Sequence, residues 1–351
     1  MTNRADGRWA ERAVGNVRME DAGHVRLAAR PPDRPLTPVI VGPTAVGKTA
    51  VAMSLAQRLP VTIISADARQ VYRRLDIGTA KPAPALRALV PHEGLDLVDP
   101  GERYSAGRFA REAAGWLTAA RAGARLPLVV GGTGFYVRAL ADGLFQEPPL
   151  DPARRAQVRE WAATLPGTDL SRWALRLDPR FSDGGRQRAA RAIEVALLTG
   201  RPLSLWQRMA RVAGVMRPWY IVLTLPRELL RRRIAERVDA MLAAGLVDEV
   251  RDELARGTAP TAAGLDGVGY REVVAMLTGQ LYKDDLRDAI VRSSRQYAKR
   301  QETWFRNQLR YRPSAVGNQQ EAVWTLDATQ DPAELAAVIE DRWRSVTVDS
   351  R

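Results

Sequence analysis

The amino-acid sequence predicts an α/β fold, in which helices flank a parallel sheet and an all-helical insertion interrupts it. From Pro38 onward, short apolar runs alternate with helical stretches, a pattern typical of a parallel sheet covered on both faces. A glycine-rich turn links the first apolar run to the first helix, as is common at the carboxyl edge of such sheets. Residues 148–215 then have helical character with no convincing strand, and the alternation resumes at Trp219.

Four apolar runs have the length and the flanking turns expected of buried strands: Val39–Val41, Val61–Ile64, Leu128–Val130 and Trp219–Leu225. The segments that separate or follow them favour helices, expected at Ala50–Leu59, Ala106–Arg121, from Thr133 onward, and at Glu228–Leu242. The C-terminal third is mostly helical, with one possible strand at Val323–Leu326.

The chain is therefore divided into an extension, a core in two parts and an insertion. Residues 1–36 mix charged residues, glycine and proline without periodicity, so we expect a disordered extension. Residues 37–147 and 216–345 are expected to form the α/β core with its C-terminal helices. Residues 148–215 are expected to form the helical insertion.

Composition narrows the class of protein. The 351 residues are 46% hydrophobic, which is enough for one large domain or two modest ones. No apolar run approaches the roughly 20 residues needed to cross a bilayer, so we expect a soluble, cytoplasmic protein. The chain contains no cysteine, which excludes disulfides and Cys-bearing zinc fingers. Its only histidines are His24 and His92, so a histidine metal cage is disfavoured.

The net charge of +13 favours a polyanionic partner, because arginine neutralises phosphate and stacks on bases. Arginine dominates the basic residues along the whole chain. A general bias toward arginine would produce the same balance, so charge alone leaves nucleic-acid binding open.

The turn after the first strand matches the phosphate-binding motif G-x-x-x-x-G-K-[ST] at every fixed position. The glycines let several backbone N–H groups point at one anion, at the positive end of the following helix. The motif is formed by Gly42, Pro43, Thr44, Ala45, Val46, Gly47, Lys48 and Thr49. Lys48 adds a mobile positive charge, and the Thr49 hydroxyl is placed to bind Mg²⁺. The fold class becomes a P-loop NTPase-like parallel sheet, while the phosphate compound stays open.

Two further segments follow predicted strands and should reach the same edge of the sheet. Asp67 comes just after the second strand, where a carboxylate could bind Mg²⁺ or accept a proton. A helix N-cap is the alternative role for it. The turn Gly131–Gly134 brings backbone and the Thr133 hydroxyl to this edge, although a purely structural turn fits equally well.

These motifs together resemble the tRNA dimethylallyltransferase family. GPTAVGKT, the Asp67-x-x-Gln-x-Tyr segment with DIGTAKP, and VGGTGFY occur in the order and spacing of that family. Later segments agree, beginning at Arg186, Arg227, Val268 and Arg295. The resemblance spans about residues 38 to 311. DIGTAKP beside the phosphate loop is far more specific than the loop alone.

The resemblance implies transfer of a dimethylallyl group from dimethylallyl diphosphate to N6 of the adenosine that follows the tRNA anticodon on its 3′ side. The phosphate loop would hold the diphosphate, with Mg²⁺ on Thr49 and help from Arg233. Asp67 would be the general base, and Thr133 would hydrogen-bond near the reacting groups. The positions that match the family's tRNA contacts are Asp67, Ala68, Arg69, Gln70, Thr133, Arg155, Gln187, Arg188 and Arg191. We expect a monomer.

Some side chains and alternatives stay open. Arg233 and Arg237 lie four residues apart on one helix, so they could face the diphosphate or pair with carboxylates such as Glu236. Ala68 stands where the family usually has serine, which removes a hydroxyl near the base. The aromatic residues Tyr297, Trp304 and Phe305 could stack on RNA or pack in the core.

Three other functions share some of these features. A P-loop kinase of a small metabolite would use the same loop, with the insertion as a lid. An RNA-binding NTPase would need a water-positioning residue, which the sequence does not identify. A relative that prenylates free adenine nucleotides would not need the basic helical segments. The motif series favours the tRNA enzyme.

Overall fold

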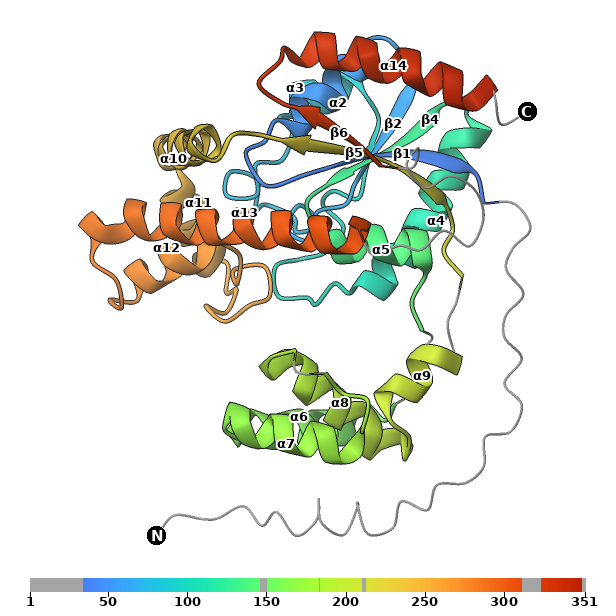
Figure 1. The fold of residues 1–351 in the computed structure, drawn as a ribbon. Helices are drawn as coiled ribbons and strands as arrows, with labels where there is room; N and C mark the ends of the chain where they lie inside the picture. The colour runs from blue at the N-terminus through green and yellow to red at the C-terminus, as the bar shows by residue number, and fades with distance from the viewer. Residues whose placement is uncertain (1–33, 146–149, 183, 210–212, 311–322, 349–351) are drawn as a thin grey trace, which may run out of the picture. The chain divides into compact units, whose positions relative to one another are not determined.

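The computed structural model describes residues 34–145, 150–182, 184–209, 213–310 and 323–348 (Figure 1). They form two compact units, one reaching Asp142 and resuming at Gly214, the other running from Gly143 to Ala213. We expected these breaks at residues 147/148 and 215/216. The expected extension lies outside the described residues except for positions 34–36, and Leu36 already belongs to the first strand.

The core unit is built on a six-stranded sheet in the order β3-β2-β4-β1-β5-β6, with every pairing parallel. The predicted α/β class is therefore confirmed. The strands are β1 Leu36–Val41, β2 Val61–Ser65, β3 His92–Glu93, β4 Leu126–Gly131, β5 Arg217–Thr224 and β6 Val323–Asp327. β1, β2 and β4 are almost entirely buried, as expected where helices cover both faces of a sheet.

The register of the sheet aligns the carboxyl ends of its central strands. Val41 is level with Gly131 of β4 and with Val222 of β5, while Ser65 is level with Val130. The phosphate loop, the Asp67 segment and the Gly131–Gly134 turn therefore leave the same edge of the sheet.

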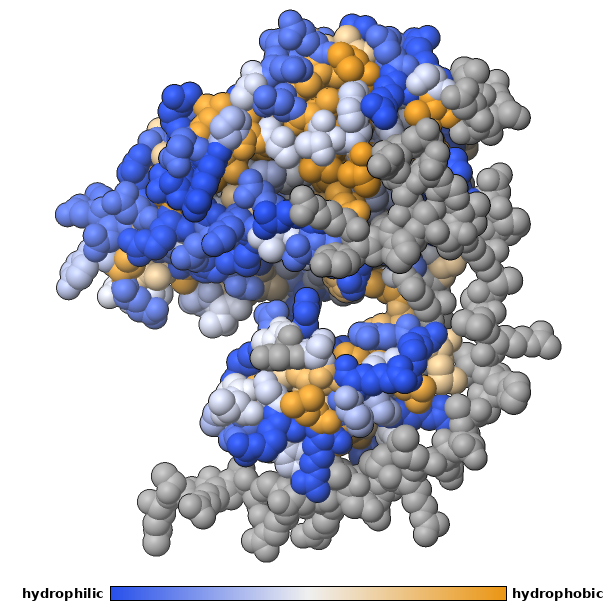
Figure 2. Space-filling model, viewed as in Figure 1, coloured by the Kyte–Doolittle hydropathy of each residue, from blue (hydrophilic) through white to orange (hydrophobic). Residues whose placement is uncertain are grey.

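Helices cover both faces of this sheet (Figure 1). α2 (Lys48–Ala56) and α14 (Pro332–Val348) pack together on one face, whereas α4 (Ala106–Ala122) and α5 (Gly134–Asp142) lie on the other. Beside the sheet edge lie α10 (Arg227–Ala243), α11 (Leu246–Ala255), α12 (Tyr270–Leu277) and α13 (Leu286–Arg310). Figure 2 shows hydrophilic side chains gathered over α10 and α13, which agrees with their many arginines.

The second unit contains α6 (Pro152–Thr164), α7 (Gly167–Leu177), α8 (Arg186–Thr199) and α9 (Leu203–Met209). No strand occurs in its described residues, as the sequence predicted. Its small core is formed by buried residues of α6, α7 and α8, among them Leu170 and Ile193. The short α9 is tied to this core because the carboxylate of Asp178 accepts hydrogen bonds from the backbone N–H and hydroxyl of Ser204, at 2.8 and 2.7 Å.

The sequence missed two short elements, β3 and α3 (Pro84–Leu89). β3 pairs only two residues with β2, which is too short for an apolar period to reveal. α3 buries none of its residues, so it has no apolar stripe for pattern analysis to detect. Within the described ranges, no helix is long and apolar enough to span a membrane.

Candidate active site

The phosphate loop connects β1 to α2 and adopts a backbone conformation that requires its glycines. Gly47 sits at the N-terminus of α2 with φ 106°, in the left-handed region. A Cβ on Gly42 would lie 2.6 Å from the carbonyl oxygen of Leu223, so a larger residue would displace β5. The loop is therefore shaped by close backbone packing against the neighbouring strand, as well as by its own turn geometry.

Lys48 lies half-buried at the centre of the loop. Its ammonium donates hydrogen bonds to the carbonyl oxygens of Gly42 at 3.0 Å and Pro43 at 2.7 Å. The pKa of Lys48 is lowered to about 8, mainly because desolvation disfavours the charged ammonium; the charge of Asp67 acts in the opposite direction, and that of Arg237 adds to the lowering. An incoming anion would relieve this desolvation, so the site favours a negatively charged ligand.

Two arginines of α10 lie against the same loop. Arg237 donates to the hydroxyl of Thr44 at 3.0 Å, and Arg233 approaches the carbonyl oxygen of Val46 at 3.5 Å. Burial lowers the pKa of Arg237, partly offset by the charge of Asp67. Glu236 instead approaches Arg232, at 3.7 Å. Of the two alternatives left open by the sequence, the geometry therefore favours arginines directed at the loop.

Asp67 lies beyond the end of β2, across from these cations. Its Oδ1 accepts a hydrogen bond from the backbone N–H of Arg69 at 2.8 Å, which closes a local turn. No helix begins here in the described chain, so Asp67 is not a helix N-cap. The hydroxyl of Thr133 accepts from the backbone N–H of Ala68 at 2.9 Å and so joins the Asp67 turn to the end of β4.

The Gly131–Gly134 turn is glycine-rich because three segments meet there. A Cβ on Gly131 would lie 2.2 Å from the carbonyl oxygen of Ala66, and one on Gly132 would lie 2.2 Å from Nε2 of Gln301. Both approaches exclude a side chain. The turn therefore has a structural role, and its packing is what places Thr133 beside Asp67.

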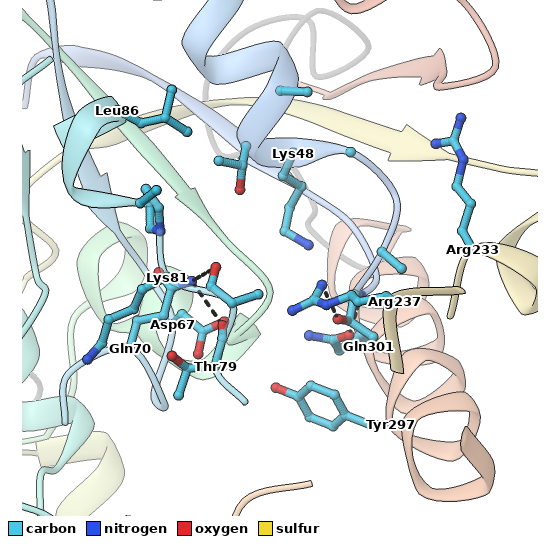
Figure 3. Close-up of a pocket in the computed structure, with 18 of the residues that line it drawn as sticks. Lys48, Asp67, Gln70, Thr79, Lys81, Leu86, Arg233, Arg237, Tyr297 and Gln301 are labelled. Atoms are coloured by element: carbon cyan, nitrogen blue, oxygen red, sulfur yellow. Dashed lines mark hydrogen bonds between the residues drawn. The ribbon is translucent and has the colours of Figure 1, made fainter. Parts of the chain in front are cut away.

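Lys48, Asp67, Arg233 and Arg237 line one cavity of about 630 Å³, and Thr133 lies outside this lining (Figure 3). Lys48, Arg237 and Tyr297 point into it from one side, and Asp67 and Thr79 lie on the other. The charged side chains that face it are the cations Lys48, Arg233 and Arg237 and the carboxylates Asp67 and Glu236, while Lys81 borders it with a fully buried side chain. The cavity combines a cationic wall with an opposing carboxylate.

The predicted contact residue Gln70 lines this cavity but is held by the protein. Its Oε1 accepts from the hydroxyl of Ser65 at 2.8 Å, and its Nε2 donates to the carbonyl oxygens of Thr79 and Ala80, both at 3.2 Å. Its two amide protons are therefore directed at the protein, and its oxygen keeps one lone pair beyond the bond from Ser65. Arg69 is anchored likewise, through a 2.9 Å hydrogen bond to the carbonyl oxygen of Ala263.

The other predicted tRNA contacts belong to the helical unit. Arg155 and Arg191 both contact the carboxylate of Glu194, Arg155 at 2.9 Å, and Arg159 adds a third ion pair at 2.5 Å. Burial alone would raise the pKa of Glu194, but these arginines outweigh it and hold the pKa below its ordinary value. Gln187 and Arg188 are exposed at the beginning of α8.

Two residues of α13 complete the core site: Gln301, which was given no role from the sequence, and Tyr297, for which the sequence left RNA stacking or core packing open. Gln301 contacts the phosphate loop and the Gly131–Gly134 turn, and burial raises the pKa of Tyr297 to about 12. The segment Tyr-Ala-Lys-Arg-Gln was visible as part of the family resemblance, but a glutamine on a helix face gives no sign of a partner far away in sequence. Phe305 is only 2% exposed and Trp304 packs on Gly134, so both serve packing.

The family model described as IPP transferase matches residues 70–308, and one described as isopentenyl transferase matches residues 37–88. The chain is 43% identical over 279 residues to a tRNA dimethylallyltransferase of Syntrophobacter fumaroxidans, covering 78% of this chain and 82% of the relative. It is 47% identical over 277 residues to a tRNA dimethylallyltransferase of Halorhodospira halophila, covering 77% and 89%.

Among solved structures, the full-length tRNA isopentenylpyrophosphate transferase of Bacillus halodurans superposes with a TM-score of 0.63 at 32% identity. The match covers 91% of this chain and all of that one. The motif series, from the phosphate loop to Arg306, falls within the residues that the two family models match. The chain therefore belongs to the IPP transferase family, the family of the tRNA dimethylallyltransferases.

Proposed function

We propose that this protein is a tRNA dimethylallyltransferase that moves the dimethylallyl group from dimethylallyl diphosphate to N6 of the adenosine on the 3′ side of the anticodon. One observation carries the proposal beyond family membership. A phosphate loop with three cations faces Asp67 across a single cavity, so a leaving diphosphate and a proton acceptor fit at opposite ends of one reaction path.

The positive charges beside the phosphate loop support binding of the diphosphate there. As the allylic C–O bond breaks, negative charge grows on the diphosphate and positive charge on the allylic carbon. Lys48, Arg233 and Arg237 offset the negative charge, together with the N–H groups at the start of α2. Because these groups are held in place before the ligand arrives, little reorganisation is needed during the reaction.

The role of Asp67 follows from the chemistry of the acceptor. The exocyclic amine of adenine is a weak nucleophile, because its lone pair is delocalised into the ring. Asp67 accepts the N6 proton as the new C–N bond forms. The turn that holds its carboxylate on the N–H of Arg69 keeps one oxygen fixed, and the other is available for the proton. Thr133 stabilises this turn through the N–H of Ala68.

Mg²⁺ fits this site as a companion of the diphosphate. In the described ranges, no group of three or more His, Cys, Asp or Glu residues could hold a metal. Mg²⁺ is commonly bound by one or two protein oxygens together with phosphate oxygens and waters. The hydroxyl of Thr49 lines the cavity and supplies one such oxygen. When bound, the ion would neutralise charge on the leaving diphosphate.

For tRNA, we assign contacts to exposed polar side chains of the helical unit, foremost the cation Arg188 and the neutral amide Gln187, because both are open to solvent. Arg155 and Arg191 would act from positions held by Glu194. The adenine must leave the anticodon stack to reach Asp67, which costs less in a loop than in a duplex.

The test is transfer of label from radioactive dimethylallyl diphosphate, in the presence of Mg²⁺, to unmodified bulk tRNA, with AMP as a parallel acceptor. We expect label in tRNA and not in AMP. A tRNA anticodon stem–loop with guanosine in place of the target adenosine is the matched control and should remain unlabelled.

Two results would overturn the proposal. Label in AMP alone would identify a free-nucleotide prenyltransferase. Absence of label, combined with ATP turnover on a hydroxylated metabolite, would identify a kinase.

A further inference from the structure

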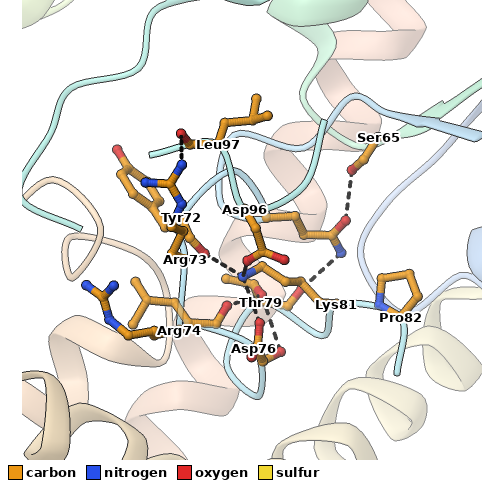
Figure 4. Close-up of polar contacts among 12 residues, drawn as sticks. Ser65, Tyr72, Arg73, Arg74, Asp76, Thr79, Lys81, Pro82, Asp96 and Leu97 are labelled. Carbon is orange, nitrogen blue, oxygen red and sulfur yellow. Dashed lines mark hydrogen bonds and ion pairs between the residues drawn. The ribbon is translucent and has the colours of Figure 1, made fainter. Parts of the chain in front are cut away.

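The DIGTAKP segment is the most specific motif of the chain, yet most of it has no part in the chemistry above. Its lysine, Lys81, is completely enclosed: the side chain has no exposed surface. The ammonium donates to Oδ1 of Asp76 at 2.7 Å, to Oδ1 of Asp96 at 2.7 Å and to the carbonyl oxygen of Tyr72 (Figure 4). All three protons of the ammonium are thus used within the protein.

These partners come from three separate stretches of chain. Tyr72 ends the segment that begins at Asp67, Asp76 opens the loop that carries Thr79, and Asp96 follows β3. The loop folds back on itself because the N–H of Lys81 donates to the carbonyl oxygen of Asp76 at 3.1 Å. The Lys81 ammonium therefore cross-links the segments that surround the carboxylate side of the cavity.

The cluster is electrically balanced. Arg87 pairs with Asp96 at 2.6 Å and approaches Asp76 at 3.8 Å, so two cations face two carboxylates. Burial alone would raise the pKa of Asp96, but Lys81 and Arg87 outweigh it and the pKa lies below its ordinary value. Loss of Lys81 would leave two carboxylates facing each other with Arg87 alone.

The loop that Lys81 holds is linked to the site through Gln70. The amide of Gln70 donates to the carbonyl oxygens of Thr79 and Ala80, the two residues just before Lys81. The backbone carbonyl of Gln70 accepts from the N–H of Asp96 at 3.2 Å. Gln70 is thus held from both sides by segments that the Lys81 cluster orders, and it lies three residues after Asp67.

We propose that Lys81 is a positioning residue, which holds the Asp67–Tyr72 segment in its reactive place through the Asp76–Lys81 loop and Gln70. Lys81 contributes to the transfer step without binding the diphosphate. The inference rests on the proposed function, because the rate that it controls is that of dimethylallyl transfer. Misplacement of a reacting group by about 1 Å can cost roughly 100-fold in rate.

The test compares Lys81→Met with Lys81→Arg and with Lys283→Met, an exposed lysine that serves as the matched control. Three quantities are measured on the full chain: the single-turnover rate of transfer to a tRNA anticodon stem–loop, the affinity for Mg²⁺-pyrophosphate, and the melting temperature. For Lys81→Met we expect a rate lower by about 100-fold with pyrophosphate affinity within about twofold of wild type. Lys81→Arg should recover part of the rate, and Lys283→Met should match wild type.

A second variant separates positioning from loss of stability. Lys81→Met with Asp96→Asn restores the charge balance of the cluster, so the melting temperature should recover while the rate stays low. Combination of Lys81→Met with Gln70→Ala should slow transfer no more than the slower single variant, because both act through one link.

Three outcomes would overturn the inference: a Lys81→Met rate within about threefold of wild type, a parallel loss of rate and pyrophosphate affinity, or additive effects of the Lys81 and Gln70 changes.

Amide hydrogen exchange provides a readout that needs no substrate, and Lys81→Met should speed exchange at Asp96, Leu97 and Val98. Unchanged exchange there would also contradict it. If the wild-type protein transfers no label to tRNA, the proposed function fails, and the exchange measurement still decides the role of Lys81.

Discussion

The side-chain oxygen of Gln301 accepts a hydrogen bond from the backbone N–H of Thr44 at 2.8 Å, although 257 residues separate the two in sequence. The other end of the same amide donates to the carbonyl oxygen of Gly132 at 3.0 Å. One glutamine of α13 therefore spans the phosphate loop and the turn that carries Thr133. Through Thr133, which accepts from the N–H of Ala68, this turn is joined to the Asp67 segment.

We expect Gln301→Leu to loosen the phosphate loop, because the N–H of Thr44 and the carbonyl of Gly132 both lose their partner. An unsatisfied buried polar group costs about 1–3 kcal/mol. Affinity for Mg²⁺-pyrophosphate should fall by about 5- to 150-fold, measured by calorimetry. Gln308→Leu makes the same chemical change at a partly exposed position of the same helix and should have little effect. Equal affinities for the two variants would show that the bridge is dispensable.

The stability difference between wild type and Lys48→Met should depend on pH. The folded pKa of Lys48, about 8, lies below the ordinary value of 10.5, so folding disfavours the charged form. This penalty is complete below pH 8 and disappears as the pH rises to 10.5. Between pH 7 and 10.5, denaturant unfolding should show wild type gaining on the order of 3 kcal/mol relative to Lys48→Met. A difference that is constant with pH would contradict a buried, desolvated ammonium.

The lowered pKa of Lys48 also predicts proton uptake when an anion binds, since a bound diphosphate favours the charged ammonium. Calorimetry of pyrophosphate binding at pH 8.5, in buffers of different ionisation enthalpy, should detect this uptake. The pyrophosphate itself can exchange protons, so the relevant quantity is the difference from Lys48→Met. Identical uptake by both proteins would mean that Lys48 is already fully charged in the free site.

Asp67→Asn should slow transfer by about 100- to 10,000-fold, the usual range for loss of a general base. The asparagine oxygen can still accept from the N–H of Arg69, so the turn should persist and tRNA binding should stay close to wild type. Single-turnover transfer and filter binding of tRNA measure the two effects separately. Near-wild-type turnover would remove Asp67 from the proton-transfer step, and Asp284→Asn, at an exposed position, is the control.

Two arginines of the helical unit should respond differently to neutralisation. Arg188→Gln removes an exposed charge and should reduce the slope of log affinity for tRNA against log salt by about one, with no change in melting temperature. Arg155→Gln also removes an ion pair of the buried Glu194, so it should lower the melting temperature as well. Arg172→Gln, on an exposed arginine of α7, should change neither the salt slope nor the melting temperature.

Elements with a local cause could be predicted from the sequence. Glycine spacing predicts the phosphate loop, an apolar run predicts β5, and an amphipathic stretch predicts α4. Each of these patterns lies within one short segment of the sequence. The common edge for Asp67 and Thr133 also followed, because parallel strands place their carboxyl ends together. These parts of the fold and of the cavity required no knowledge of distant contacts.

Features that depend on distant partners could not be predicted in the same way. Gln301 is one polar residue on a long helix, and Lys81 is one residue of a family motif. Neither the helical pattern nor the motif indicates which distant segment these side chains contact, so their roles could not be predicted. Glu194 is an example from the helical unit: nothing local shows that three arginines from two helices converge on it. Side chains that join segments far apart in sequence leave no periodic signal.

The sheet order has a consequence for the synthesis of the protein. β1, with the phosphate loop at its end, lies between β4 and β5, so one of its two neighbours is translated only after the whole helical unit. Gln301 emerges later still. During translation, the phosphate loop therefore leaves the ribosome long before β5 and Gln301, which contact it. Until β5 is made, one apolar edge of β1 stays unpaired. We expect this protein to rely on chaperones during translation more than a protein of equal length with local contacts.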